Sequence, residues 1–290
     1  MQRMHISDFD LEKTVECGQI FRWEKRDGTY YITAQNNILL IRQHGDILNF
    51  SAVRGGSSFV KRYLSLDEDY SKIISSLRKD GLPEEVISSA YGLRLIRQDP
   101  FECLMSYVAS SASNIPRIKR NLNSLCRNFG RRISLGKFSS YSFPGPSEIF
   151  SRRKIENSFR KFGFGFRARF YPQIVQSVMS TENSENADEA FKKFFSRIRR
   201  MNYEGAKQAL TSLPGVGSKV ADCVLAFSLG FSEAFPTDVW VRRGVSILFF
   251  NGRNISVREA EAFGRRRFGE NAAYAQEFIY YWIRNRKKLS

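Results

Sequence analysis

Histidine and paired cysteine are scarce in this chain, and their scarcity argues against several kinds of metal centre. The 290 residues include two histidines and four cysteines, and no two cysteines form a CxxC pair. Structural zinc and iron–sulfur centres are held by clusters of such residues, so we expect no metal site. Isolated cysteines in a chain of this length also suit a reducing compartment.

Long apolar runs are also lacking. The N-terminal segment MQRMHISDFDLEKTV has no apolar core that could serve as a signal peptide. No apolar run reaches the roughly 20 residues that a membrane-spanning helix needs. We therefore expect a soluble, intracellular protein with no membrane partner.

Acidic residues are in short supply after residue 90. The chain carries a formal net charge of +17, and hydrophobic residues make up 42% of it, enough for a packed core. Residues 1–90 hold 12 basic and 13 acidic residues, whereas residues 91–290 hold 34 basic and 16 acidic ones. A positive excess concentrated in one part of the chain indicates a polyanionic partner for that part.

The patterning changes from strand-like to helix-like near residue 70. TYYITAQNNILLIRQHGDILNFSAV contains β-favouring runs broken by turn residues. Helices are predicted to start at Pro83 and after Asp99, an expected N-cap. Further amphipathic stretches lie near 115–129, 147–161, 169–180, 187–199, 203–212, 218–229, 239–250 and 272–286. We predict an α+β protein, with a β-rich domain over 1–82 and a larger, all-helical, basic domain over 83–290.

The sharpest motif is LPGVGSKVA, at 213–221, between two helix-like stretches. Gly215 and Gly217 permit backbone angles closed to other residues, so the chain can reverse direction there. The amides around Gly215, Val216 and Gly217 then lie at the positive end of the second helix, which suits a phosphate. This predicts a helix–hairpin–helix at about 203–229 that grips the DNA backbone without reading sequence. An ordinary glycine-capped turn fits the glycines alone equally well.

Lys219 falls in the first turn of the second helix, where a cation is unfavourable beside the positive helix end. A Schiff-base nucleophile must be a neutral amine, so Lys219 is a candidate nucleophile, and a surface contact with phosphate is the alternative. Asp222 shares a helix face with Lys219 but also fits a first-turn acid favoured by the helix dipole. Asp238, in PTDV, also fits an ordinary N-cap. Local chemistry does not decide between the two carboxylates.

LPGVGSKVADC followed by PTDV resembles the helix–hairpin–helix superfamily of DNA glycosylases, and more narrowly the eukaryotic-like 8-oxoguanine DNA glycosylases. The resemblance extends over nearly the whole chain, through ECGQIFRW (16–23), GLRLIRQDPFECLMSYVASSASNIPRI (92–118), FGFGFRARF (162–170) and YAQEF (274–278). It implies an antiparallel N-terminal sheet, then a helical bundle with the active cleft between helical layers. It also selects Asp238 rather than Asp222 as the catalytic carboxylate beside the nucleophile Lys219.

The resemblance implies roles for the base pocket as well. The backbone carbonyl of Gly18 is expected to accept the extra ring N–H of 8-oxoguanine. Cys223 and Tyr280 are expected to form the two walls of the pocket, and Gln276 to bond the Watson–Crick edge of the extruded base. Without the resemblance, Cys223 and Tyr280 fit core residues and Gln276 fits a surface helix position.

Arg117 and Arg167 match the arginines that recognise the orphaned cytosine in this family, although phosphate contact is the commonest duty of such arginines. The chain departs from the family pattern at three positions. Trp240 replaces the usual histidine, and Tyr280 replaces a phenylalanine. Ala112 replaces the asparagine that fills the gap left by the extruded base, with Ser113 at the neighbouring position, although Asn114 remains.

The resemblance thus implies a bifunctional DNA glycosylase and AP lyase that excises 8-oxoguanine from duplex DNA in base excision repair. We expect a monomer that needs no cofactor and associates with DNA. One alternative is a glycosylase for another damaged base, but such relatives generally use the aspartate without the lysine. The other is a noncatalytic helix–hairpin–helix protein that only binds DNA, which would make the Lys219–Asp238 pair a coincidence.

Overall fold

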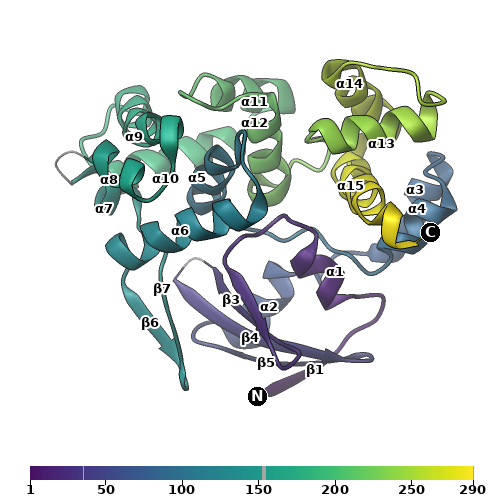
Figure 1. The fold of residues 1–290 in the computed structure, drawn as a ribbon, viewed down its shortest axis with the longest axis horizontal. Helices are drawn as coiled ribbons and strands as arrows, with labels where there is room; N and C mark the ends of the chain where they lie inside the picture. The colour runs from purple at the N-terminus through teal and green to yellow at the C-terminus, as the bar shows by residue number, and fades with distance from the viewer. Residues whose placement is uncertain (35, 152–154, 290) are drawn as a thin grey trace.

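The computed structural model describes residues 1–34, 36–151 and 155–289, and it places an antiparallel sheet beneath a larger group of helices (Figure 1). The sheet has the order β1 (Gln2–His5), β5 (Ile47–Ala52), β4 (Asn37–His44), β3 (Thr29–Ala34) and β2 (Trp23–Arg26). Ile32 pairs with Leu39, and Ile41 pairs with Phe50. The predicted α+β class, with an antiparallel N-terminal sheet, is confirmed.

One face of this sheet is buried because apolar side chains alternate along its strands. Tyr30, Ile32 and Ala34 of β3 lie in one core with Phe59 and Val60 of α2 (Gly56–Tyr63). Helix α2 was not expected from the sequence, because its first turn is GSS and glycine and serine favour turns over helices. The short helix α1 (Leu11–Glu16) leads into the segment that carries Gly18.

The predicted helices are present with small shifts of their ends. They are α4 (Glu84–Ala90), α5 (Pro100–Ser110), α6 (Ile115–Phe129), α9 (Phe170–Thr181), α10 (Ala187–Ile198), α11 (Tyr203–Thr211), α12 (Ser218–Val224) with its π-helical continuation η2 (Leu225–Leu229), α13 (Val239–Phe249) and α15 (Ala272–Leu289). The stretch expected over 147–161 contains α7 (Pro146–Phe150) and α8 (Ile155–Lys161), with 152–154 outside the described residues. The Asp99 side chain caps α5 as predicted, accepting from the amides of Phe101 and Glu102.

Several elements were not predicted. They are α3 (Tyr70–Lys79), α14 (Val257–Phe268), the short 3-10 turns η1 (Gly165–Arg169) and η3 (Gly269–Asn271), and the hairpin β6 (Arg132–Leu135)–β7 (Phe138–Tyr141). Helix α3 lies where the sequence was expected to become helical, but its bounds were not predicted. The hairpin means that the second part of the chain is mostly helical and not all-helical. Its strands are too short for period-two patterning to be visible in the sequence.

The helices form two packed groups that share one large core. Helix α12 packs on α5, whereas α4, α13 and α14 pack on α15 (Figure 1). Cys17 and Phe21, which lie between β1 and β2 in the chain, belong to this large core and not to the core of the sheet. The division into domains over 1–82 and 83–290 stays a prediction. Across the described residues, no helix is both long and apolar enough to cross a membrane.

Candidate active site

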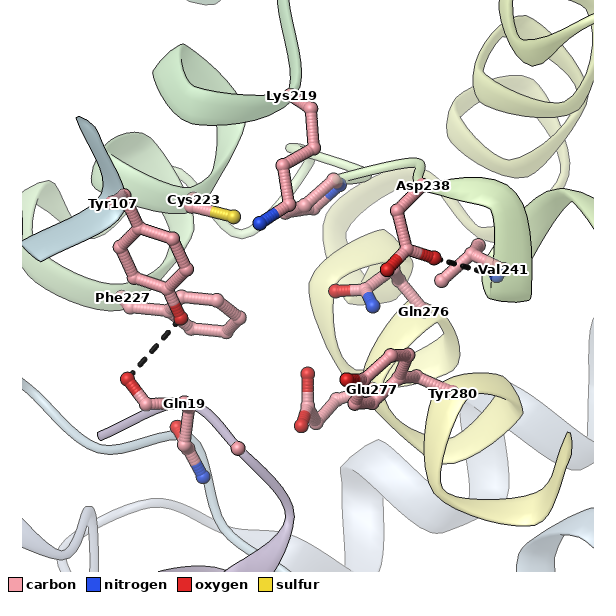
Figure 2. A pocket seen from close by; sticks show the side chains of 12 residues that line it. Gln19, Tyr107, Lys219, Cys223, Phe227, Asp238, Val241, Gln276, Glu277 and Tyr280 are labelled. Atoms are coloured by element: carbon pink, nitrogen blue, oxygen red, sulfur yellow. Dashed lines mark hydrogen bonds between the residues drawn. The ribbon is translucent and has the colours of Figure 1, made fainter. Parts of the chain in front are cut away.

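One pocket brings together all the residues predicted for catalysis and for base binding (Figure 2). Its lining includes Gly18, Lys219, Cys223, Asp238, Gln276 and Tyr280. These residues come from the segment after α1, from α12, from the start of α13 and from α15. The pocket therefore lies where the two helix groups meet, as the resemblance implies for a cleft between helical layers.

Lys219 lies in the first turn of α12, after the N-cap Gly217. Its amine nitrogen is 4.7 Å from the centroid of the Tyr107 ring, which contributes an aromatic wall to the pocket. Cys223, one turn further along, contacts the lysine on the same face of the helix, as predicted. The helix geometry thus directs the amine of Lys219 and the thiol of Cys223 into the same pocket.

Asp238 is a helix N-cap, one of the interpretations that the sequence left open, and it also lines the pocket. It is the N-cap of α13, and its Oδ1 atom accepts hydrogen bonds from the backbone amides of Trp240 at 2.8 Å and Val241 at 2.9 Å. Both bonds go to Oδ1, so Oδ2 takes part in neither. The cap fixes the carboxylate in the pocket that also holds Lys219.

Asp222 does not reach the pocket. Its side chain is fully buried on the other side of α12, where it accepts from the Tyr203 hydroxyl at 2.5 Å and from the Lys207 amine at 2.8 Å. Burial raises the pKa of Asp222 to about 6, against the opposing effect of Lys207. Because α12 begins at Ser218, Asp222 lies in the second turn, so the expectation of a first-turn acid is wrong.

The backbone at Gly18 is held in a conformation that favours glycine. Its φ is +110°, in the region that side chains rarely adopt. The next side chain, Gln19, fixes this segment by donating to the carbonyl of Arg94 at 2.7 Å and accepting from the amide of Ile96 at 2.7 Å. The Tyr107 hydroxyl donates to the Gln19 carbonyl at 3.1 Å. The edge of the pocket at Gly18 is therefore rigid.

The three other residues predicted to contact the base, Cys223, Gln276 and Tyr280, are also buried or partly buried. Gln276 is 3% exposed, and within the described ranges its Oε1 atom has no hydrogen-bond partner. Burial raises the pKa of the Cys223 thiol and of the Tyr280 hydroxyl, each to about 12. Both groups are therefore neutral near pH 7, which suits walls that contact the faces of a base.

Sequence reasoning missed six residues of the lining, which are Gln19, Tyr107, Phe227, Pro236, Val241 and Glu277. Gln19 and Tyr107 are uncharged residues within apolar stretches, so no local pattern distinguishes them from core positions. Glu277 did carry a signal, because an acid interrupts AAYAQEFI, at 272–279, where all residues are buried.

A second cluster lies beside Gly18. Asn114 caps α6 by accepting from the amide of Arg117 at 3.0 Å, and the Arg117 guanidinium donates to the carbonyl of Gly163 at 3.2 Å. Arg167 is buried, and it donates to the carbonyls of Ser111, Ala112 and Phe164. The structure thus brings the two arginines close enough for Arg117 to lower the pKa of Arg167, after the larger effect of burial.

The hairpin between α11 and α12 has the conformation that its glycines indicate. Gly215 has a φ of +77°, and the Phe170 ring packs where a Cβ atom would lie. The amide of Val216 donates to the carbonyl of Leu213 at 3.1 Å, so this amide is occupied within the turn. Gly217 is exposed, with no atom within 4 Å of the position of a Cβ. The entrance to α12 is therefore open at Gly217.

A helix–hairpin–helix whose lysine meets an N-cap aspartate across a pocket defines a DNA glycosylase of the helix–hairpin–helix class. A sequence profile described as 8-oxoguanine DNA glycosylase, N-terminal domain, matches residues 2–104. The N-glycosylase/DNA lyase of Saccharomyces cerevisiae is 31% identical over 254 residues, which cover 82% of this chain and 67% of that protein. The N-glycosylase/DNA lyase OGG1 of Arabidopsis thaliana is 30% identical, covering 94% and 77% respectively.

A solved structure is similar over the full length of this chain. The Clostridium acetobutylicum 8-oxoguanine glycosylase/lyase, in complex with double-stranded DNA containing cytosine opposite 8-oxoguanine, has a TM-score of 0.87 and 27% identity, with 99% of each chain covered. This chain belongs to the 8-oxoguanine DNA glycosylase family.

Proposed function

We propose that this chain is a bifunctional DNA glycosylase and AP lyase that excises 8-oxoguanine from duplex DNA in base excision repair. The observation that carries the proposal is the pocket that holds Lys219, Asp238, Gln276 and the backbone of Gly18 together. A glycosidic bond inside the base stack is out of reach, so the damaged nucleotide must be extruded into this pocket. Its base lies between Cys223 and Tyr280.

Lys219 is the nucleophile in this proposal. Its neutral amine attacks C1′ of the sugar while the bond from C1′ to the base nitrogen breaks, and the base leaves with the electron pair of that bond. Asp238 stabilises the positive charge that develops on the sugar, because its capped carboxylate stays in place during the reaction. Loss of a proton from the amine completes the exchange.

The covalent product accounts for the lyase step. The bond from C1′ to the ring oxygen then breaks, the ring oxygen takes up a proton, and the sugar–lysine adduct becomes a Schiff base, which makes the proton at C2′ acidic. Removal of that proton breaks the bond from C3′ to the 3′ phosphate by β-elimination, the phosphate leaves with the electron pair, and the strand is nicked. These steps involve only the nucleotide, Lys219 and proton transfers, so this chemistry asks for no cofactor.

The Gly18 carbonyl selects the lesion in this proposal. It accepts the N–H at position 7 of 8-oxoguanine, whereas unmodified guanine has a lone pair there and would face the carbonyl unfavourably. Gln276 bonds the Watson–Crick edge, since its side-chain oxygen, which has no partner among the residues that the structure describes, points into the pocket (Figure 2). Arg117 and Arg167, beside Asn114, contact the orphaned cytosine.

The hairpin at 215–217 provides phosphate contacts, with Gly217 the most open position. Salt-dependent attraction by the basic part of the chain adds to these contacts. We propose that the protein acts on DNA as a monomer, because a single pocket carries both the nucleophile and the carboxylate.

The decisive experiment measures release of free base from a duplex with a single 8-oxoguanine opposite cytosine, and from matched duplexes with an alkylated purine or with no lesion. Release of 8-oxoguanine supports the proposal. Release of only the alkylated base identifies a glycosylase for another lesion. Binding of all duplexes without release identifies a noncatalytic DNA-binding protein.

A further inference from the structure

Glu277 is a carboxyl group in the base pocket that the reaction described above does not use. It lies on α15, is 3% exposed, and lines the pocket together with Lys219 and Asp238 (Figure 2). Within the part of the chain that the structure describes, its Oε1 atom has no hydrogen-bond partner. A buried polar atom without a partner is destabilising, and a ligand that supplies the partner offsets this cost.

The position of Glu277 on the rim of the pocket follows from its neighbours. On one side its carboxyl is in hydrogen-bonding contact with the thiol of Cys17, which precedes Gly18 in the chain. On the other side it adjoins Gln276 along α15. The carboxyl therefore lies between the backbone at Gly18 and the amide of Gln276.

The position of the Glu277 carboxyl between Gly18 and Gln276 determines which part of the base it faces. On the perimeter of a purine base, position 6 lies between position 7 and the Watson–Crick edge. If Gly18 faces position 7 and Gln276 faces the Watson–Crick edge, then the group between them faces position 6. Guanine-type bases carry an oxygen acceptor there, whereas adenine-type bases carry an amino donor.

The charge state of the carboxyl decides which of these substituents it favours. Burial raises the pKa of Glu277 to about 7, and Asp238 acts in the same direction, whereas the Cys17 thiol, Lys219 and Arg284 act in the opposite direction. The other titratable groups around it are Tyr107, Cys223 and Tyr280. Below pH 7 the neutral carboxyl can donate a hydrogen bond, and above pH 7 the carboxylate only accepts.

We propose that Glu277 is a specificity-determining residue that reads position 6 of the extruded purine, with its neutral carboxyl donating a hydrogen bond to O6 of the oxidised guanine. The proposal rests on the base orientation given under Proposed function. It predicts that ionisation of Glu277 weakens the preference for a 6-oxo purine over a 6-amino purine. Both 8-oxoguanine and 8-oxoadenine have the N–H at position 7, so the Gly18 carbonyl can accept a hydrogen bond from either base.

The test is the ratio of single-turnover excision rates on duplexes containing 8-oxoguanine or 8-oxoadenine opposite cytosine, measured from pH 6 to pH 8. A pH effect on the chemistry that is common to both substrates affects both rates and cancels in the ratio. For the wild type we expect the ratio to fall by about ten-fold across this range, because the neutral fraction of a carboxyl with a pKa of about 7 falls from about nine-tenths at pH 6 to about one-tenth at pH 8. A ratio that stays constant would overturn the proposal.

Two variants separate Glu277 from other titrating groups. Glu277→Gln keeps the shape and a donor at every pH, so its ratio should not change with pH. Asp222→Asn removes another buried carboxyl with a raised pKa, outside the pocket, and should keep the wild-type pH dependence. A Glu277→Gln protein with the wild-type dependence would show that another group titrates. Failure of the wild type to release 8-oxoguanine at any pH would instead contradict the proposed function.

Discussion

The two sides of helix α12 place polar groups in opposite situations. On the side away from the pocket, the buried Asp222 is bonded to Tyr203 and Lys207, and Lys207 also pairs with Glu261. On the pocket side, Lys219 faces Gln276 and Glu277, each of which has a buried oxygen without a partner among the described residues.

The difference indicates what each side does. A network in which the charged groups are paired stabilises the folded chain and offers no group to a substrate. Unpaired buried groups destabilise the empty site, and they are available to a base that enters it. The following variants break or sharpen this contrast, beginning with the largest expected effect.

Replacement of the lysine on the pocket side should abolish the covalent step. Lys219→Gln removes the amine that forms the Schiff base, so borohydride should trap no protein–DNA adduct on an 8-oxoguanine duplex. Lys207→Gln is the matched control on the other side of α12. It should keep the adduct and lower the thermal unfolding midpoint, because it leaves Asp222 without its cation. An adduct formed by Lys219→Gln at the wild-type yield would contradict the assignment of the nucleophile.

Replacement of Asp238, on the pocket side of α12, should impair catalysis, whereas replacement of Asp222, on the other side, should mainly impair stability. Asp238→Asn should slow base excision by about 10²–10³-fold with duplex binding nearly unchanged, because the charge is lost while asparagine still caps a helix. Asp222→Asn should affect excision much less but lower the free energy of unfolding by about 1–3 kcal/mol, because it disturbs a buried network. Single-turnover rates and urea denaturation measure both effects. The opposite ranking in excision would mean that the wrong carboxylate was chosen.

Gly18→Ala should weaken binding to lesion DNA by about ten-fold, roughly the loss of one hydrogen bond, and binding to undamaged DNA by less. The alanine Cβ would meet only ordinary contacts, at 3.5 Å or more, so the effect comes from the φ of +110° and the displaced carbonyl. Equilibrium binding to duplexes that differ only in the oxidised base measures the difference. Equal losses on both duplexes would argue against a role of Gly18 in selecting the lesion.

The smallest effects are expected opposite the lesion. Ala112 has a φ of +47°, which asparagine tolerates better than alanine, so Ala112→Asn should fold well. It should sharpen the preference for cytosine over adenine opposite 8-oxoguanine by a few-fold, and Arg117→Ala should flatten it. Excision opposite each of the four bases measures this preference.

The same measurement tests whether Arg117 and Arg167 recognise the base opposite the lesion. If Arg117→Ala slows all four duplexes by the same factor, Arg117 contacts the DNA backbone and does not recognise the base. Arg167→Ala is a less specific probe, because its guanidinium also holds the carbonyls of Ser111 and Ala112. That variant should lower stability as well as selectivity.

Local patterns predicted most of the helices and the strand-rich segment that holds β3, β4 and β5, because caps, turns and hydrophobic periods act over a few residues. The N-cap at Asp99 and the helix over 115–129 are examples. Local chemistry could not decide between Asp222 and Asp238, because the decision depends on which side of α12 each residue faces after folding. The resemblance made that decision, and the choice stays a prediction, although the structure places Asp238 and not Asp222 in the pocket with Lys219.

The remaining parts of the site depend on contacts between distant segments. Tyr107 reaches the pocket because α5 packs on α12, and no pattern within α5 indicates this. Glu277 was visible as an acid in an apolar stretch, but only its contact with Cys17, far away in the sequence, shows where on the rim it lies.

The packing of α15 on α4 has a consequence for synthesis of the protein. Because α15 carries Gln276, Glu277 and Tyr280, a growing chain can complete the sheet, the hairpin and the helix of Lys219 before any wall for the base exists on that side. The side of the pocket that faces Lys219 is therefore complete only when α15 has docked on α4.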